Sequence, residues 1–208
     1  MTLSNRKILR TLLCLLAGTL YAVCLSACDA KEPLSENRDA EIESPVIAND
    51  LSNQKVTAIA EDTQGHIWIG TFRGLNKNNV HDYHQYFCTD DSLGLPDNQI
   101  THLLRDSKNR FWVGTVNGVC LYTDKDNFRI IPIEADNKNV RQILEDRNGR
   151  IFLNTGFQLY AYHPREEKIT CVLPEISPGN AFYAQCHIAP DNNLWVMTST
   201  GLRCYDPS

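Results

Sequence analysis

The chain has 208 residues, of which 42% are hydrophobic and 22% are charged. This balance is that of an ordinary globular protein and excludes disordered, collagen-like and multi-span membrane classes. The formal net charge is −5, and three basic residues precede the first acid, at Arg6, Lys7 and Arg10. The remainder is therefore more acidic than the whole and has no basic stripe, which argues against nucleic acid as a partner.

The N-terminus predicts a helical signal peptide over residues 1–27. Residues 11–25 are almost wholly apolar, but a membrane-spanning helix needs about 20 apolar residues, so this run has the proportions of a secretory segment. It ends in Leu25-Ser26-Ala27-Cys28, which resembles the lipobox of bacterial lipoproteins. That resemblance implies that Cys28 is lipidated and becomes the new N-terminus. A plain signal peptide cut after Ala27 and an uncleaved anchor stay open as alternatives, and each of them exports the chain.

Residues 28–50 are interpreted as a lipidated N-terminus followed by a flexible tether. The segment is polar, acidic and poor in aromatic residues, a composition that cannot bury enough apolar surface to fold alone. We expect a periplasmic or outer-membrane lipoprotein that touches the membrane only through its lipid anchor.

The rest of the chain repeats, with a period that decides its architecture. Four segments align in phase, at residues 56–71, 100–115, 140–155 and 183–198. Their large aromatic residues are spaced 44, 40 and 43 residues apart, at Trp68, Trp112, Phe152 and Trp195. The repeats run from about residue 51 to the end of the chain.

Each repeat predicts antiparallel strands, because its apolar runs are β-branched or aromatic and keep no helical period. A turn such as Asp62-Thr63-Gln64-Gly65 joins the first two strands, and its aspartate can accept backbone N–H bonds. The last turn position tolerates positive φ, being Gly65, Asn109, Gly149 and Asn192. Third and fourth strands follow, so each unit predicts a propeller blade with its large aromatic residue packed between neighbouring sheets.

The predicted fold class is therefore all-β, a propeller with three blades and part of a fourth, at about 51–94, 95–134, 135–177 and 178–208. Closed propellers contain about four to eight blades, so we expect an incomplete or open ring. Residues 41–48 have weak strand character and are the candidate for a closing strand. Exposed blade edges would invite a protein partner or a second copy.

The repeats resemble the two-component regulator propeller family. The resemblance rests on the lead Leu51-Ser52-Asn53-Gln54-Lys55-Val56, the Asp-x-x-Gly turn, the Trp68-Ile69-Gly70-Thr71 core and the following Gly74-Leu75. The second copy matches throughout, whereas the third and fourth depart, for example at Phe152 and Met197. The resemblance implies an exported, non-catalytic sensory module of a two-component-type system, from a longer hybrid sensor kinase, with oligosaccharide ligands.

Two other classes of function stay open: a cell-surface scaffold that pairs with another propeller, and a propeller hydrolase or lyase. The recurring Asp62, Asp106 and Asp146 are interpreted as turn formers, since the pattern differs by one position from the Asp-box of sialidases and lacks its partner groups. We therefore predict no catalytic, cofactor-binding or metal-binding residue.

Other chemistry-bearing residues are scattered. His81 and His84 flank an aspartate, but strand alternation would place them on opposite faces. Residues 76–82 are expected to form the longest loop of the first blade. Cys186 occupies a core aliphatic position and is expected to be a buried thiol, and no disulfide pair is named. Most aromatic residues outside the repeat anchors, such as Tyr86 and Tyr160, are expected in the core.

Overall fold

The computed structural model describes residues 45–89, 94–123, 125–174, 184–198 and 201–206. Contacts divide the chain into Met1–Glu41 and Ile42–Ser208, and all described residues belong to the second unit. The predicted signal peptide, Cys28 and most of the predicted tether lie outside the described residues. Within the described part, no helix is both long enough and apolar enough to cross a membrane.

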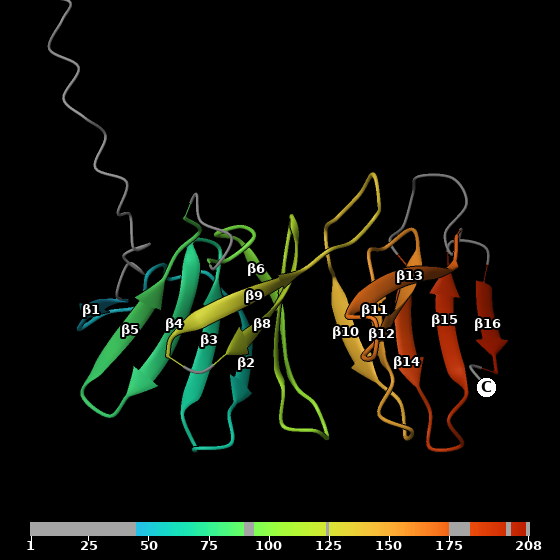
Figure 1. Ribbon diagram of the computed structural model, residues 1–208, viewed down its shortest axis with the longest axis horizontal. Helices are drawn as coiled ribbons and strands as arrows, with labels where there is room; N and C mark the ends of the chain where they lie inside the picture. The colour runs from blue at the N-terminus through green and yellow to red at the C-terminus, as the bar shows by residue number, and fades with distance from the viewer. Residues whose placement is uncertain (1–44, 90–93, 124, 175–183, 199–200, 207–208) are drawn as a thin grey trace, which may run out of the picture. The chain divides into compact units, whose positions relative to one another are not determined.

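The described residues form sixteen strands in four antiparallel sheets (Figure 1). In spatial order, the first sheet contains β1 (Val46–Ala48), β5 (Asp82–Tyr86), β4 (Gly74–Asn79), β3 (Ile67–Thr71) and β2 (Val56–Glu61). The second contains β6 (Ile100–Arg105), β7 (Phe111–Thr115), β8 (Gly118–Thr123) and β9 (Asn127–Ile131). The third contains β10 (Gln142–Glu145), β11 (Ile151–Asn154), β12 (Leu159–His163) and β13 (Lys168–Leu173), and the fourth contains β14 (Gln185–Ile188), β15 (Leu194–Thr198) and β16 (Gly201–Tyr205).

The four sheets pack in chain order, and the strands that begin the repeats, β2, β6, β10 and β14, lie at the contacts between sheets. Strand β6 contacts β2, β10 contacts β6, and β14 contacts β10. The sheets therefore stack side by side in a row, as Figure 1 shows. This is the arrangement of propeller blades, and it confirms the all-β propeller with three four-stranded repeats and part of a fourth.

The tryptophans of the first two repeats fill the spaces between sheets. The Trp68 ring centroid lies 5.0 Å from that of Phe111 and 4.7 Å from that of Tyr122, both on the second sheet. The Trp112 ring lies 4.9 Å from the ring of Tyr162 on the third sheet. All these indoles are fully buried. Truncating a buried aromatic residue typically lowers the free energy of unfolding by about 3–5 kcal/mol. The stability of each of these sheets therefore depends on packing against the next sheet.

The Asp-x-x-Gly turns are tied together by their own aspartates, as predicted. In the second sheet, Asp106 Oδ1 accepts the backbone N–H of Lys108 at 3.0 Å and of Arg110 at 2.8 Å. Its Oδ2 accepts the indole N–H of Trp112 at 2.8 Å and Arg110 Nε at 2.6 Å. The turn ends in Asn109 at φ 62°. One buried carboxylate thus fixes the turn, the indole and a guanidinium together.

A second recurring bond explains the Gly-Thr and Gly-Leu pattern. The hydroxyl of Thr71 donates to the carbonyl of Gly74 at 2.8 Å, and that of Thr115 donates to Gly118 at 3.0 Å. Gly74 adopts φ 114°, a conformation that other residues rarely take. In the third repeat the residue with positive φ is Gly156, at 90°. The position equivalent to Gly74 and Gly118 therefore does not need glycine, and Gln158 occupies it.

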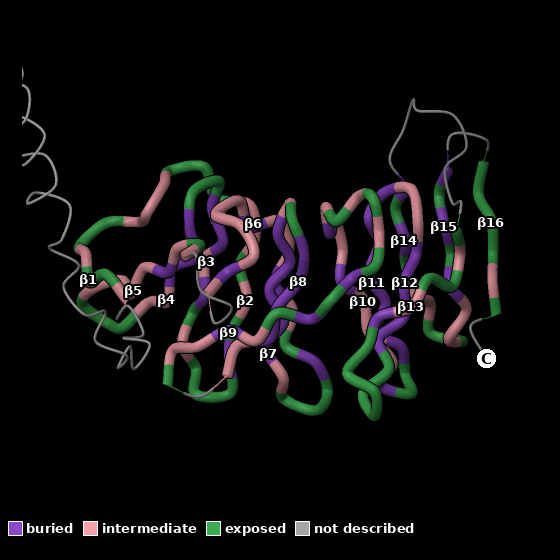
Figure 2. Tube along the Cα trace, turned by 45° about the horizontal axis from the view of Figure 1, so that its top comes forward, coloured by how far each residue is buried: buried purple, intermediate pink, exposed green. Residues whose placement is uncertain are grey.

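The predicted packing is wrong for the fourth aromatic residue. Trp195 is 37% exposed, because it lies on the face of the fourth sheet opposite Leu194 and Val196, which pack against the third sheet. The first sheet also has an exposed face, on its side away from the second sheet. Ile59 is 66% exposed, although the equivalent Leu103, Ile143 and Cys186 are buried. Figure 2 shows buried segments inside the row and exposed strands at both ends. These two end faces are defined by Trp195, Met197 and Leu202 on the fourth sheet and by Ile59 and Ile67 on the first.

Two further expectations need correction. Val46–Ala48 does form a strand, but β1 pairs antiparallel with β5 at the outer edge of the first sheet, with Ile47 opposite His84, and not with the fourth sheet. Residues 76–82 do not form a long loop, because Asn76–Asn79 belong to β4 and a tight turn leads directly into β5. His81 lies in that turn and not on a strand.

Cys186 is a buried free thiol, as predicted. Cys120 is also a buried free thiol, and Cys171 and Cys204 are exposed free thiols. Burial raises the pKa of Cys186 to about 12, so this thiol stays protonated and packs as a small apolar group.

Replacing the turn carboxylate tests its structural role. Asp106→Ala should lower the free energy of unfolding by on the order of 2–4 kcal/mol, because buried donors of the turn and the Trp112 indole lose their acceptor. Urea unfolding followed by tryptophan fluorescence measures this. Asp191→Ala is the control, since Asp191 lies exposed in the fourth turn and should change stability far less. Equal effects of the two substitutions would contradict the assignment.

Candidate functional site

A polar cavity lies between the first and second sheets, at the end of the sheets where the Asp-x-x-Gly turns lie. Its volume is about 560 Å³, within the range of roughly 300–1,000 Å³ that is usual for ligand pockets. The β2–β3, β6–β7 and β8–β9 turns meet there because alternate turns of an antiparallel sheet share one end. The lining residues are Asp62, Thr63, Gln64, Lys77, Arg105, Asn109, Arg110, Phe111, Tyr122, Thr123, Lys125 and Asp126.

The Asp62 carboxylate is held entirely by its own hairpin. Its Oδ1 accepts the backbone N–H of Gln64 at 2.8 Å and of His66 at 3.0 Å. Its Oδ2 accepts the Trp68 indole N–H at 2.9 Å and lies 3.1 Å from His66 Nδ1. Burial acts to raise the pKa of Asp62, but the bonds from Trp68, Gln64 and His66 outweigh it and hold the pKa below its ordinary value. Asp62 is therefore an ionised structural group.

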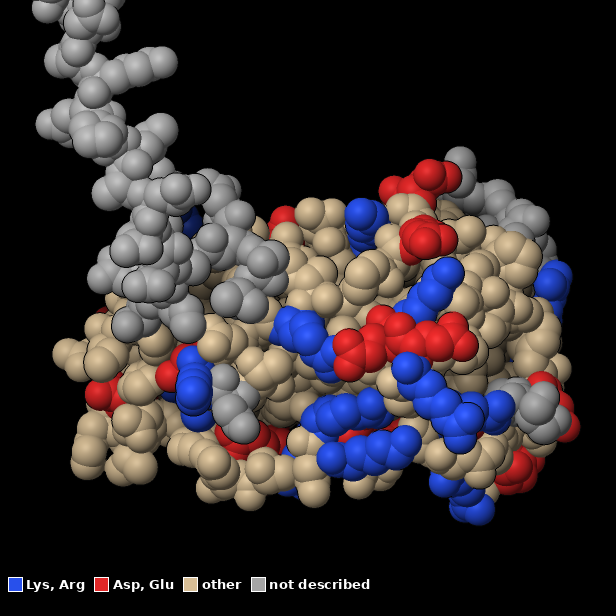
Figure 3. All heavy atoms as spheres, in the orientation of Figure 1, with Lys and Arg blue, Asp and Glu red and all other residues tan. Residues whose placement is uncertain are grey.

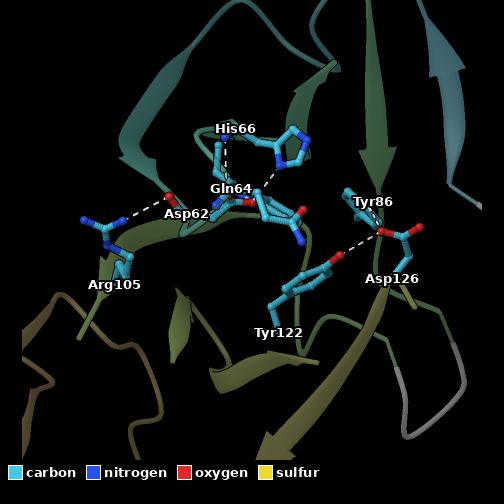
Figure 4. A network of polar contacts seen from close by, with 8 residues as sticks. Asp62, Gln64, His66, Tyr86, Arg105, Tyr122 and Asp126 are labelled. Atoms are coloured by element: carbon cyan, nitrogen blue, oxygen red, sulfur yellow. Dashed lines mark hydrogen bonds and ion pairs between the residues drawn. The ribbon is translucent and has the colours of Figure 1, made fainter. Parts of the chain in front are cut away.

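A second carboxylate joins the two sheets at the other side of the cavity. The hydroxyl of Tyr86 donates to Asp126 Oδ1 at 2.6 Å, and the hydroxyl of Tyr122 donates to the same atom at 2.9 Å (Figure 4). Tyr86 comes from β5 and Tyr122 from β8. Burial and the bond to Asp126 raise the pKa of both phenols, so both remain donors at neutral pH.

Four basic side chains line the same cavity. Arg105 Nη1 donates to the backbone carbonyl of Asp62 at 3.0 Å, which ties the end of β6 to the first sheet. The Arg110 guanidinium is engaged by Asp106 at 2.6 Å. Lys77 Nζ lies 5.3 Å from the Trp68 ring centroid and 5.5 Å from that of Tyr122. Lys125 lies at the β8–β9 turn, beside Asp126.

Charge elsewhere on the described surface is mixed. On the face shown in Figure 3, basic and acidic side chains are interspersed. Ion pairs join Arg129 on β9 to Glu167 in the β12–β13 turn and, at 4.0 Å, Lys168 on β13 to Glu134, which follows β9. The cavity differs from this surface because four cationic groups converge on it with two acids.

Another cavity, of about 430 Å³, lies between the third and fourth sheets. Apolar side chains form much of its wall, including Phe152, Leu159, Leu173 and Tyr205. It offers fewer directional polar groups than the first cavity, so we take the cavity between the first two sheets as the candidate functional site.

Sequence reasoning found only part of this site. The turn aspartate Asp62 was singled out, but Lys77, Tyr122, Lys125 and Asp126 were missed. The sequence signal for these residues is weak, because they lie in different repeats. The contact of Tyr86 and Tyr122 with Asp126 forms only when two repeats stack. The described residues contain no group of three or more side chains placed to hold a metal ion. His84 Nε2 lies 4.0 Å from Asp82 Oδ1.

Solved structures with a similar fold include extracellular domains of putative two-component systems. The extracellular domain of the putative hybrid two component system BT4673 from B. thetaiotaomicron is 24% identical with a TM-score of 0.61, over 74% of this chain and 21% of that one. The corresponding domain of BT3049 is 20% identical with a TM-score of 0.62, over 77% of this chain and 23% of that one. The chain thus spans less than a quarter of the length of these structures.

Enzymes share the fold as well. Virginiamycin B lyase from Staphylococcus aureus is 19% identical with a TM-score of 0.55, over 78% of this chain and 60% of that one. At these identities the likeness shows the fold alone. No curated protein matches the chain.

The sequence family described as two component regulator propeller matches residues 50–73 and 94–117. These are the two segments that carry the complete pattern of lead, aspartate turn and tryptophan core, in the first and second sheets. The chain therefore carries two component regulator propeller repeats.

Proposed function

We propose that the chain is the exported, ligand-binding part of a two-component-type sensor, with an oligosaccharide as its ligand. The family match of the first two repeats and the fold shared with extracellular sensor domains support this. The module is non-catalytic in this proposal, a fragment of a longer hybrid sensor, and Cys28 carries a lipid that holds it at a membrane surface.

The cavity between the first two sheets is the observation that carries the proposal. Sugars are recognised by directional hydrogen bonds to hydroxyl groups together with aromatic surface. Gln64, Asn109 and Thr123 supply neutral donors and acceptors, and Tyr122 and Phe111 supply aromatic edges. Because the walls come from two rigid sheets, the groups are positioned before a ligand arrives, which reduces the entropy cost of binding.

The state of the carboxylates supports binding without catalysis. Hydrolysis of a glycosidic bond ordinarily uses two carboxyl groups, one of which is available as an acid. Asp62 is committed to four contacts within its own hairpin, and Asp126 accepts two phenolic hydroxyls. Neither is arranged as a proton donor.

A second candidate function is a scaffold that binds a second copy of itself through its end faces. Trp195 at one end is 37% exposed and Ile59 at the other is 66% exposed, although both occupy positions that are buried between sheets elsewhere. Two copies joined end to end would contain eight sheets, within the range of about four to eight for closed propellers. Met197 replaces the glycine of the first two repeats, so the docked sheet would lie farther away than within the chain.

Blocking the cavity tests the first function. Gln64→Trp should abolish the binding of any oligosaccharide that binds the wild-type chain in calorimetric titrations, because the indole fills the cavity mouth. Asn148→Trp is the control, since it occupies the same turn position in the third sheet, away from the cavity. Unchanged affinity of Gln64→Trp, or no heat with any sugar, would refute the proposal.

Lipidation is tested at Cys28. When the full chain is expressed in a bacterial host, mass spectrometry should find a diacylglycerol-modified N-terminal Cys28, and Cys28→Ser should leave the membrane fraction. Cys24→Ser, within the apolar run, should remain in that fraction. An unmodified residue 28 in the wild-type protein would exclude the anchor.

The second candidate is tested by sedimentation. A head-to-tail pair requires both end faces, so Trp195→Lys and Ile59→Lys should each convert a dimer into monomers. Val80→Lys is the control, because Val80 is 83% exposed in the β4–β5 turn and belongs to neither face. A wild-type chain that stays monomeric at high concentration, or a dimer that survives Ile59→Lys, would contradict this arrangement.

A further inference from the structure

We infer that the cavity between the first and second sheets binds an acidic oligosaccharide, whose carboxylate or sulfate groups lie against Lys77 and Lys125. The inference rests on the proposed function, because it names the chemical class of the sugar. It is carried by the charges of the cavity wall and by how each charged group is already engaged.

The carboxylates of the wall already accept hydrogen bonds from the protein, whereas two of the lysines there form no described ion pair. Every described partner of the Asp62 carboxylate lies in its own hairpin, and Asp126 Oδ1 accepts hydrogen bonds from two phenols. Arg110 is paired with Asp106. Among the residues that the structure describes, Lys77 and Lys125 form no ion pair. The described side chains that line the cavity thus carry four positive charges and two negative ones, although the protein as a whole is acidic.

Different features position the two lysines. Lys77 extends from β4 over the faces of Trp68 and Tyr122, which keeps its stem against apolar surface and its charge at the cavity. Lys125 is displayed by a strained turn. Lys125 and Asp126 adopt φ 68° and 61° in succession, a conformation that glycine or asparagine usually takes.

The turn is kept in this conformation by the tyrosine pair. Tyr86 reaches across from the first sheet and Tyr122 stands on the second, and both bind the Asp126 carboxylate (Figure 4). This anchors residue 126 from both sides and fixes the position of residue 125. The backbone at Lys125 is therefore fixed at the cavity, and its flexible side chain carries a positive charge that suits an anionic group on a ligand.

An acidic sugar would use the whole wall. Its carboxylate or sulfate would accept hydrogen bonds from the lysine ammonium groups. Its hydroxyl groups would bond to Gln64, Asn109 and the unoccupied acceptor positions of Asp126. A neutral sugar would satisfy only the second set and would gain nothing from the charges of Lys77 and Lys125.

Matched ligands test the inference. A short oligogalacturonate should bind about tenfold or more tightly than its fully methyl-esterified form, which has the same backbone without charge. The preference should shrink when salt rises from about 50 mM to about 500 mM, because the contact is electrostatic. A sulfated oligosaccharide and its desulfated form make the same comparison. Inorganic sulfate is the probe for a simple anion, and sulfate that binds as tightly as the sugar would overturn the assignment to an acidic sugar.

Matched variants locate the effect. Lys77→Gln combined with Lys125→Gln should remove the preference for the charged ligand, while Lys138→Gln, an exposed lysine outside the cavity, should keep it. Thermal unfolding checks that the double variant is folded. If charged and esterified sugars bind equally and Gln64→Trp abolishes both, the proposed function stands and this inference is wrong. If neither sugar binds, the proposed function fails, and this inference fails with it.

Discussion

The packing of one large aromatic side chain per repeat against the next sheet is the interaction on which the rest of the structure depends. A four-stranded sheet cannot bury both of its faces alone, and stacking supplies the missing cover. Trp68 meets Phe111 and Tyr122, and Trp112 meets Tyr162. The same tyrosine position thus serves successive interfaces. The candidate site exists because this stacking brings the turns of two sheets together.

The fold could be predicted from the sequence because its determinants are local and recur. The aspartate turn, the threonine–glycine bond and the spacing of the aromatic anchors lie within one repeat, so four aligned copies reveal them without knowledge of tertiary contacts. The exposure of Trp195 could not be predicted in this way, because it depends on whether another sheet covers the position and not on the residue itself. The strand Val46–Ala48 was likewise visible as a pattern, but not its partner β5.

The site was harder to predict for the same physical reason. Lys77 and Tyr122 belong to different repeats, and Asp126 gains its role only when Tyr86 reaches it from the first sheet. A turn of lysine and aspartate carries no strong propensity for positive φ, so its geometry follows from tertiary bonds and not from the residues. Residues that act together across two stacked repeats cannot be identified from the sequence of either repeat alone.

The closed hydrogen bonding of each aspartate turn has a consequence for how such a protein can change. Because Asp62 and Asp106 bind the backbone of their own turns and hold their own indoles, the side chains at the tips, such as those of Gln64 and Lys108, take no part in this hydrogen bonding. Substitution at a tip alters what the rim offers to solvent while the hairpin beneath it keeps its shape. The architecture can therefore diversify its recognition chemistry position by position without losing the ability to fold.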